Sequence, residues 1–90
     1  MQASEILQQL KMYITEQVLD GKDAGLDETT PLLEWGILNS FETIRLVVFI
    51  QNRFSVKVPS DKLLDASYFA NLPGLINLVL ESPADDLVKR

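Results

Sequence analysis

The chain changes character at Gly36-Ile37-Leu38-Asn39-Ser40-Phe41-Glu42, where an irregular segment gives way to a long apolar one. Asn39, with Glu42 three positions on, resembles a capping box, a pattern that satisfies the first free amides of a helix. The pattern predicts a helix from Phe41 to Phe54. The chain has no His and no Cys, so nothing in it activates Ser40 as a nucleophile in the usual ways. We therefore interpret this hydroxyl as an attachment point rather than a catalyst.

Composition narrows the class of protein further. Ninety residues, 47% of them hydrophobic and 23% charged, predict one small globular domain without a deep enclosed cleft. The lack of Cys and His excludes disulfides and thiolate or imidazole metal sites. The loop acids Asp23, Asp27 and Glu28 are too scattered for a calcium motif, so we expect no metal. An enzyme in its own right is the least supported class.

The net charge of -5 argues against nucleic acid or an anionic membrane surface as a partner, because both are negative. The N-terminal segment lacks a signal-peptide core, and no apolar run is long enough to span a bilayer. We expect a cytoplasmic protein whose partners are other proteins.

Apolar residues at helical spacing predict the elements before and after the central helix. Ser4 begins a segment with Leu7, Leu10, Ile14 and Val18, which ends near Asp20-Gly21. The loop that follows, residues 21–38, has no periodicity and is expected to be held to the core by its large apolar side chains. Those side chains are Leu26, Leu32, Leu33, Trp35 and Ile37, with Trp35 predicted to plug the loop into the core.

Two shorter patterns complete the fold. Ser60-Asp61 predicts a short helix through Leu63 and Leu64, and Tyr68 to Leu80 predicts a final helix with Pro73 in its first turn. We predict an all-α four-helix bundle with a long loop between helices one and two and a short third helix. We predict a single domain over residues 1–82, followed by a flexible C-terminal tail at 83–90.

The faces of the central helix predict its core and its contact surface. Leu46, Ile50 and Phe54, with Val47 beside them, form the stripe assigned to the core. The opposite side lies close to Ser40 and is predicted to dock partners by hydrophobic contact. We assign to it Phe41, Glu42, Arg45, Val48, Phe49 and Asn52, with Leu63 and Leu64 from the third helix. The alternative is that the loop buries Val48 and Phe49, and that Leu63 and Leu64 are core residues.

A resemblance spans nearly the whole chain. Its strongest part is Pro31-Leu32-Leu33-Glu34-Trp35-Gly36-Ile37-Leu38-Asn39-Ser40, followed by Val58-Pro59-Ser60 and then by Tyr68-Phe69 with Leu72. These residues resemble the phosphopantetheine-dependent acyl and peptidyl carrier proteins. They are most similar to the stand-alone (type II) peptidyl carriers that hold L-proline during oxidation to pyrrole in pyoluteorin, prodigiosin and clorobiocin biosynthesis. Asn39 replaces the usual aspartate, as it does in this prolyl subgroup.

The resemblance implies a cofactor and a set of partners. A phosphopantetheinyl transferase would attach 4'-phosphopantetheine to Ser40, beside Asn39 and Phe41. An L-prolyl-AMP ligase would load the arm with proline as a thioester, and a flavin-dependent prolyl-carrier dehydrogenase would oxidise the ring. A halogenase or downstream synthase could follow, and carriers of this kind act as monomers.

Other functions stay open at this point. The same serine would serve a carrier of another cargo, of the hydroxymalonyl or D-alanyl type. Asn39 and Ser40 could also be a simple helix cap, worth about 1 kcal/mol, in an unmodified helical interaction domain.

Overall fold

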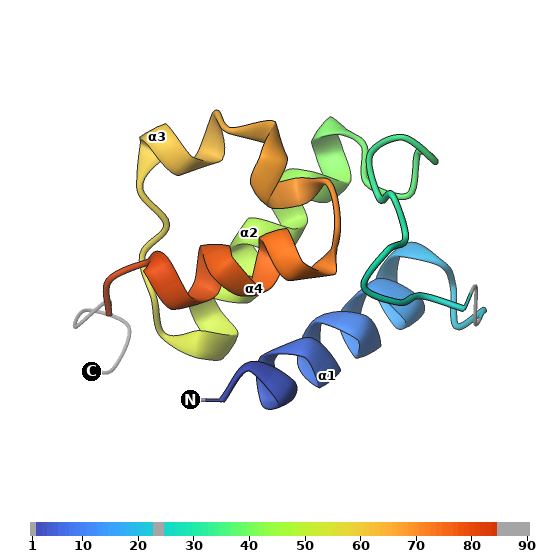
Figure 1. Cartoon of the computed structure of the whole chain (residues 1–90), viewed down its shortest axis with the longest axis horizontal. Helices are drawn as coiled ribbons and strands as arrows, with labels where there is room; N and C mark the ends of the chain where they lie inside the picture. Colours follow the sequence, from blue (N-terminus) through green and yellow to red (C-terminus); the bar gives the residue numbers. More distant parts are fainter. Residues whose placement is uncertain (1, 23–24, 85–90) are drawn as a thin grey trace.

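The computed structural model describes residues 2–22 and 25–84. Over these residues the elements are α1 (Ala3–Tyr13), a π-helical turn η1 (Ile14–Val18), α2 (Ser40–Phe54), α3 (Ser60–Leu63), a 3-10 turn η2 (Ala66–Phe69) and α4 (Leu72–Glu81). Figure 1 shows α4 crossing in front of α2, with α1 along one side and the short α3 at the periphery. The predicted all-α fold, with its long first connection and short third helix, is confirmed.

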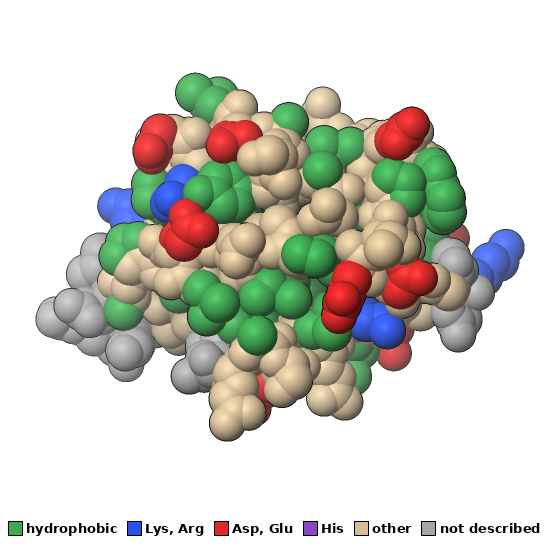
Figure 2. Space-filling model, in the orientation of Figure 1, with side chains coloured by type: hydrophobic (Ala, Val, Ile, Leu, Met, Phe, Trp, Pro, Cys, Tyr) green, Lys and Arg blue, Asp and Glu red, His purple; other side chains and the backbone are tan. Residues whose placement is uncertain are grey.

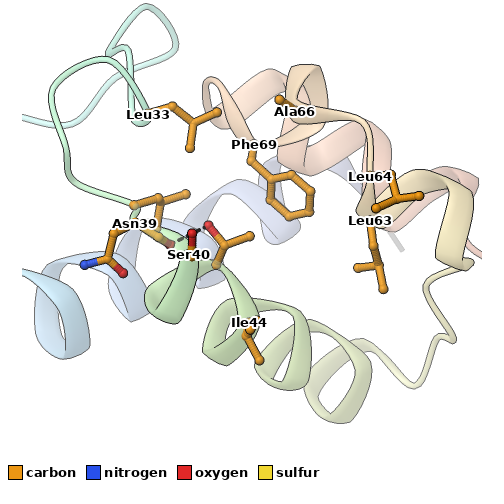
Figure 3. A pocket seen from close by; sticks show the side chains of 10 residues that line it. Leu33, Asn39, Ser40, Ile44, Leu63, Leu64, Ala66 and Phe69 are labelled. Atoms are coloured by element: carbon orange, nitrogen blue, oxygen red, sulfur yellow. Dashed lines mark hydrogen bonds between the residues drawn. The ribbon is translucent and has the colours of Figure 1, made fainter.

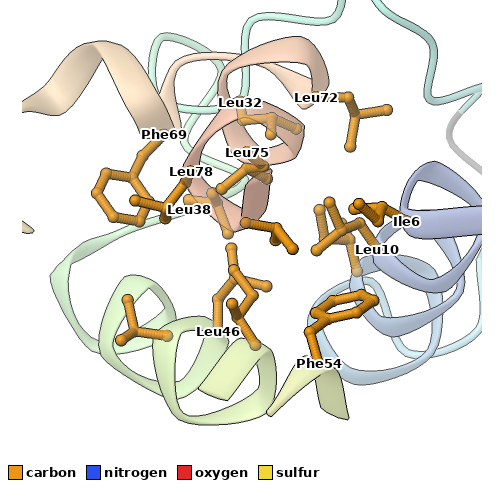
Figure 4. Close-up of a cluster of buried hydrophobic side chains, with 14 of the residues drawn as sticks. Ile6, Leu10, Leu32, Leu38, Leu46, Phe54, Phe69, Leu72, Leu75 and Leu78 are labelled. Atoms are coloured by element: carbon orange, nitrogen blue, oxygen red, sulfur yellow. The ribbon is translucent and has the colours of Figure 1, made fainter. Parts of the chain in front are cut away.

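The core forms where α1, α2 and α4 turn their apolar stripes toward one another (Figure 4). Complete burial of a Leu or Ile side chain contributes about 1.5–3 kcal/mol. The α2 stripe is the predicted one, whereas in α1 Ile6 takes the buried place expected for Leu7. The buried residues are Ile6 and Leu10 of α1 with Ile14 at the start of η1, then Leu46, Val47, Ile50 and Phe54 of α2, then Leu72, Leu75, Leu78 and Val79 of α4.

Capping residues set the helix boundaries. The Asn39 side chain accepts a hydrogen bond from the Glu42 N–H at 2.8 Å, which confirms one half of the expected capping box. The α2 helix ends at Phe54, and the following residue, Ser55, has a left-handed φ of 54°. At α4, Asn71 caps by accepting from the Gly74 N–H at 2.9 Å, and Pro73 lies in the first turn as predicted. This helix therefore begins at Leu72 and not at Tyr68, because η2 and the extended Asn71 intervene.

The long connection between α1 and α2 is held by leucines and by backbone bonds. Leu26, Leu32 and Leu38 are buried, and the Leu32 N–H donates to the Ala70 carbonyl at 2.8 Å. Leu33 and Ile37 pack against the core as partly buried residues. The prediction for Trp35 is wrong, because 65% of this residue is exposed.

The chain stays attached to the domain beyond α4. The Lys57 N–H donates to the Pro83 carbonyl at 2.9 Å, and Val56 pairs with Ala84 in an isolated antiparallel bridge. Residues 85–90, most of the tail expected to be flexible, lie outside the described residues. Its flexibility stays a prediction.

None of the helices within residues 2–22 and 25–84 combines the length and hydropathy that a bilayer crossing requires. On the face shown in Figure 2, red acidic side chains are scattered among green hydrophobic ones rather than gathered in one patch.

Candidate functional site

Ser40 is the first residue of α2 and is exposed. Asn39 holds the chain just before it in an extended conformation and caps the helix. In the described part of the chain, the N–H groups of Ser40 and Phe41 donate to no other protein group. These free amides lie at the positive end of the helix dipole, where an anion is stabilised.

Beside Ser40 lies a groove of about 520 Å³. Figure 3 shows Ser40 and Ile44 of α2 on one side, with Phe69 of η2 and the leucines at α3 facing them. None of the lining side chains carries a charge. The lining residues are Leu33, Leu38, Asn39, Ser40, Thr43, Ile44, Leu63, Leu64, Ala66 and Phe69.

The two hydroxyl groups of this groove differ in their bonding. The Thr43 hydroxyl donates to the Asn39 carbonyl at 2.8 Å, which closes the first turn of α2. The Ser40 hydroxyl makes no hydrogen bond within the described residues, and the residue is exposed. Ser40 therefore offers the groove's accessible hydroxyl.

An arm joined through a phosphodiester fits this arrangement of residues. Its anion would be stabilised by the free amides at the start of α2, and the groove offers apolar surface to the rest of the arm. Within residues 2–22 and 25–84, no cluster of three or more Asp or Glu side chains could hold a metal ion.

Exposed apolar side chains lie on α2 and at the end of α3, the two helices that contribute to the groove. Phe41 and Val48 of α2 are exposed as predicted, and so are Leu63 and Leu64, the latter to 87%. Leu63 and Leu64 are therefore not core residues. Sequence reasoning missed Ile44, which is 65% exposed and lines the groove. The spacing of Phe41, Ile44 and Val48 at i, i+3 and i+7 is the signal that could have found it.

Three residues assigned to this surface have other contacts. Phe49 is half-buried and stacks on Tyr13, so the structure does not place it on the exposed surface. Glu42 is paired with Arg45 at 3.2 Å, and its side chain is only 15% exposed. The Arg45 guanidinium lies 5.7 Å from the centre of the Phe41 ring, a cation–π distance. Arg45 and Phe41 thus form one exposed unit.

Comparison with known proteins identifies the class to which this fold and groove belong. Residues 5–76 match the family described as "Phosphopantetheine attachment site", and the chain belongs to that family. Members carry 4'-phosphopantetheine covalently and tether acyl groups for other enzymes, so the chain is a carrier protein and not an enzyme. Its partners include a phosphopantetheinyl transferase and biosynthetic enzymes.

Two individual matches illustrate what the chain is similar to. The chain is 34% identical over 67 residues to "Probable acyl carrier protein PigG" from Serratia sp. (strain ATCC 39006), a match that covers 74% of this chain and 76% of the relative. It also resembles a chain in a structure titled "Crystal structure of FAD-dependent dehydrogenase". That match has a TM-score of 0.70 and 33% identity and covers 78% of this chain and 97% of the other.

Proposed function

We propose that Ser40 bears the 4'-phosphopantetheine arm and that the carrier holds L-proline for oxidation to a pyrrole-2-carboxyl group. The observation that best supports Ser40 as the attachment site is the difference between the two hydroxyls of the groove. The Thr43 hydroxyl is hydrogen-bonded, whereas the Ser40 hydroxyl is free within the described residues. When attached, the arm supplies the thiol on which a cargo is held as a thioester, a nucleophile that this chain lacks. Asn39 fixes the start of α2, and Phe41 lies next to the attachment point.

The proposed cargo rests on the resemblance of the sequence to the prolyl carriers and on the match to a chain in the dehydrogenase structure. The run from Pro31 to Ser40 resembles the prolyl carriers. The match covers 78% of these 90 residues and 97% of the chain from the dehydrogenase structure. That chain is therefore no larger than a small carrier protein. A chain so short buries too little surface to enclose a flavin. The match therefore supports a flavin-dependent dehydrogenase as a partner.

The expected sequence of partners follows from this cargo. An L-prolyl-AMP ligase activates the amino acid and loads the carrier, a flavin-dependent dehydrogenase oxidises the ring, and a halogenase or downstream synthase receives the product. The tether raises the local concentration of substrate at each enzyme. The exposed apolar surface formed by Phe41, Ile44, Val48, Leu63 and Leu64 is the docking face we propose, with Arg45 at its edge. We place these steps in the cytoplasm, with the carrier acting as a monomer.

Loading of the modified carrier tests the cargo. The carrier is first treated with coenzyme A and a broad-specificity phosphopantetheinyl transferase. It is then incubated with ATP, an L-prolyl-AMP ligase and either L-proline or D-alanine. Intact-protein mass spectrometry should show a prolyl addition with L-proline alone. Pantetheine without proline would indicate a carrier of other cargo, such as a hydroxymalonyl or D-alanyl group. No addition at all would indicate an unmodified interaction domain.

A further inference from the structure

The α3 helix cannot hold its own position by burial. It has only four residues, Ser60–Leu63, and none of them is buried. A single helical turn is not stable alone in water, because nucleation costs more than its few hydrogen bonds return. Leu63 and Leu64 nonetheless line the groove beside Ser40. The buried Val58 anchors the chain just before α3, but within α3 itself the contacts that fix this side of the groove lie outside the hydrophobic core.

Three polar side chains provide such contacts. The Lys62 ammonium donates to the Tyr68 hydroxyl oxygen at 3.2 Å and to the Glu81 carboxylate at 3.1 Å. The Tyr68 hydroxyl in turn donates to the same Glu81 oxygen at 2.7 Å. Lys62 belongs to α3, Tyr68 to η2 and Glu81 to the last turn of α4. The cluster thus ties the short helix to two elements anchored in the core.

The three groups stabilise one another beyond an ordinary surface ion pair, which on its own contributes little. The Lys62 ammonium lies 5.1 Å from the centre of the Tyr68 ring, so it has a cation–π contact as well as two acceptors. Only 20% of the Lys62 side chain is exposed. Hydrogen bonds with Tyr68 and then Glu81 raise the pKa of Lys62, and hydrogen bonds from Tyr68 and then Lys62 lower the pKa of Glu81. Both shifts favour the charged forms that make the contacts.

We propose that Lys62, Tyr68 and Glu81 form a polar latch that holds α3 against η2 and α4 and thereby fixes the groove wall made by Leu63 and Leu64. When the latch opens, no described side-chain hydrogen bond joins α3 to η2 or α4. The short helix then keeps backbone bonds of its own turn, such as those from the Lys62 and Leu63 N–H groups to the Pro59 carbonyl and from the Asp65 N–H to the Lys62 carbonyl. The latch is a property of the unmodified chain and does not depend on which cargo the arm carries.

Amide hydrogen exchange by NMR on the unmodified protein tests the latch. Tyr68→Phe removes the bridging hydroxyl and keeps the ring, and Glu81→Gln removes the shared carboxylate charge. In each variant, the Lys62, Leu63 and Asp65 amides should exchange about 3- to 10-fold faster, because the loss of such a bond weakens the closed state by about this factor. The methyl groups of Leu63 and Leu64 should also lose order.

The matched control is Glu42→Gln, which breaks the other described ion pair, that with Arg45 on α2. It should leave exchange at residues 62–65 unchanged. The Leu10 amide of α1 reports global opening and should keep its exchange rate in all variants. Unchanged exchange at residues 62–65 in Tyr68→Phe and Glu81→Gln would overturn the proposal. Acceleration that is equal throughout the chain would overturn it too, since the cluster would then only stabilise the whole fold.

Discussion

The rings of Tyr13 and Phe49 stack with their centroids 4.3 Å apart and their planes inclined by 27°. Phe49 also meets Phe54 edge-on at 6.2 Å. These contacts join α1 to α2 and make Phe49 an extension of the core. The neighbouring Val48 is exposed and belongs to the docking face that we propose.

The aromatic contacts predict that substitutions at two adjacent residues change the free energy of unfolding by different amounts. Phe49→Ala should lower the free energy of unfolding by about 2–3 kcal/mol, since it removes half-buried ring packing and the stacked pair. Val48→Ala should change it by less than about 1 kcal/mol. Urea unfolding followed by circular dichroism measures both values. Equal losses in the two variants would contradict the assignment of Phe49 to the core.

Ile44, which is exposed and lines the groove, should affect the binding of partner enzymes rather than the stability of the fold. Ile44→Asp places a charge on apolar surface beside Ser40, and we expect kcat/KM for the phosphopantetheinyl transferase to fall about tenfold or more. Gln8→Glu adds the same charge at an exposed position of α1, outside this surface, and should leave kcat/KM close to the wild-type value. Thermal unfolding checks that both variants remain folded. Equal rates for Ile44→Asp and the wild type would remove Ile44 from the docking surface.

The sequence predicts correctly those features that depend on residues close together in the chain. The stripe of Leu46, Ile50 and Phe54 was predicted correctly, because spacing of four along one helix decides which face is buried. The Asn39 cap was also predicted, since the hydrogen bond spans only three residues. Trp35 was predicted wrongly. The loop is held instead by the buried Leu26, Leu32 and Leu38, and the indole stays exposed.

Non-local contacts account for the other differences. Nothing in the sequence near Phe49 reveals that Tyr13, far away in the chain, covers it. The same holds for the cluster of Lys62, Tyr68 and Glu81, which joins three separate elements. The prediction that Ser40 is the attachment serine comes from its local context, whereas the groove beside it depends on the path of α3 and η2.

Close packing at the start of α4 predicts a large effect for a small substitution. A Cβ atom on Gly74 would come within 2.7 Å of the Ser67 carbonyl oxygen and 2.9 Å of the Tyr68 carbonyl oxygen. Gly74→Ala should therefore destabilise the fold by about 1–3 kcal/mol, although alanine is the better helix former. Asn77→Ala, at an exposed position of the same helix, should be neutral or slightly stabilising. If urea unfolding shows Gly74→Ala to be more stable than the wild type, the expected clash between the new Cβ atom and the two carbonyl oxygens does not occur.

Hydrogen bonding in the long loop predicts a dependence of stability on pH. Bonds from the Thr29 hydroxyl and N–H, and then from Thr30, hold the pKa of Asp27 below its ordinary value of 3.8. A carboxyl whose pKa is depressed on folding stabilises the protein above its unfolded pKa, and this stability is lost as the pH falls through the folded pKa. Asp27→Asn should therefore be less stable than the wild type near neutral pH and lose less stability on acidification.

Urea midpoints at about pH 6 and about pH 3 measure this difference. Glu28→Gln is the control, because this adjacent exposed carboxylate accepts no such bonds within the described residues. An acid-induced loss in Asp27→Asn as large as in the wild type would show that the loop bonds do not favour the ionised form.

We propose above all that Ser40 is the residue modified by the phosphopantetheinyl transferase. The most direct measurement is mass spectrometry of the wild type, Ser40→Ala and Thr43→Ala after incubation with coenzyme A and the transferase, followed by peptide mapping. The wild type and Thr43→Ala should each gain one phosphopantetheine group on the peptide that contains Ser40, and a folded Ser40→Ala should gain none. A phosphopantetheine group on Ser40→Ala, or none on the wild type, would contradict the claim.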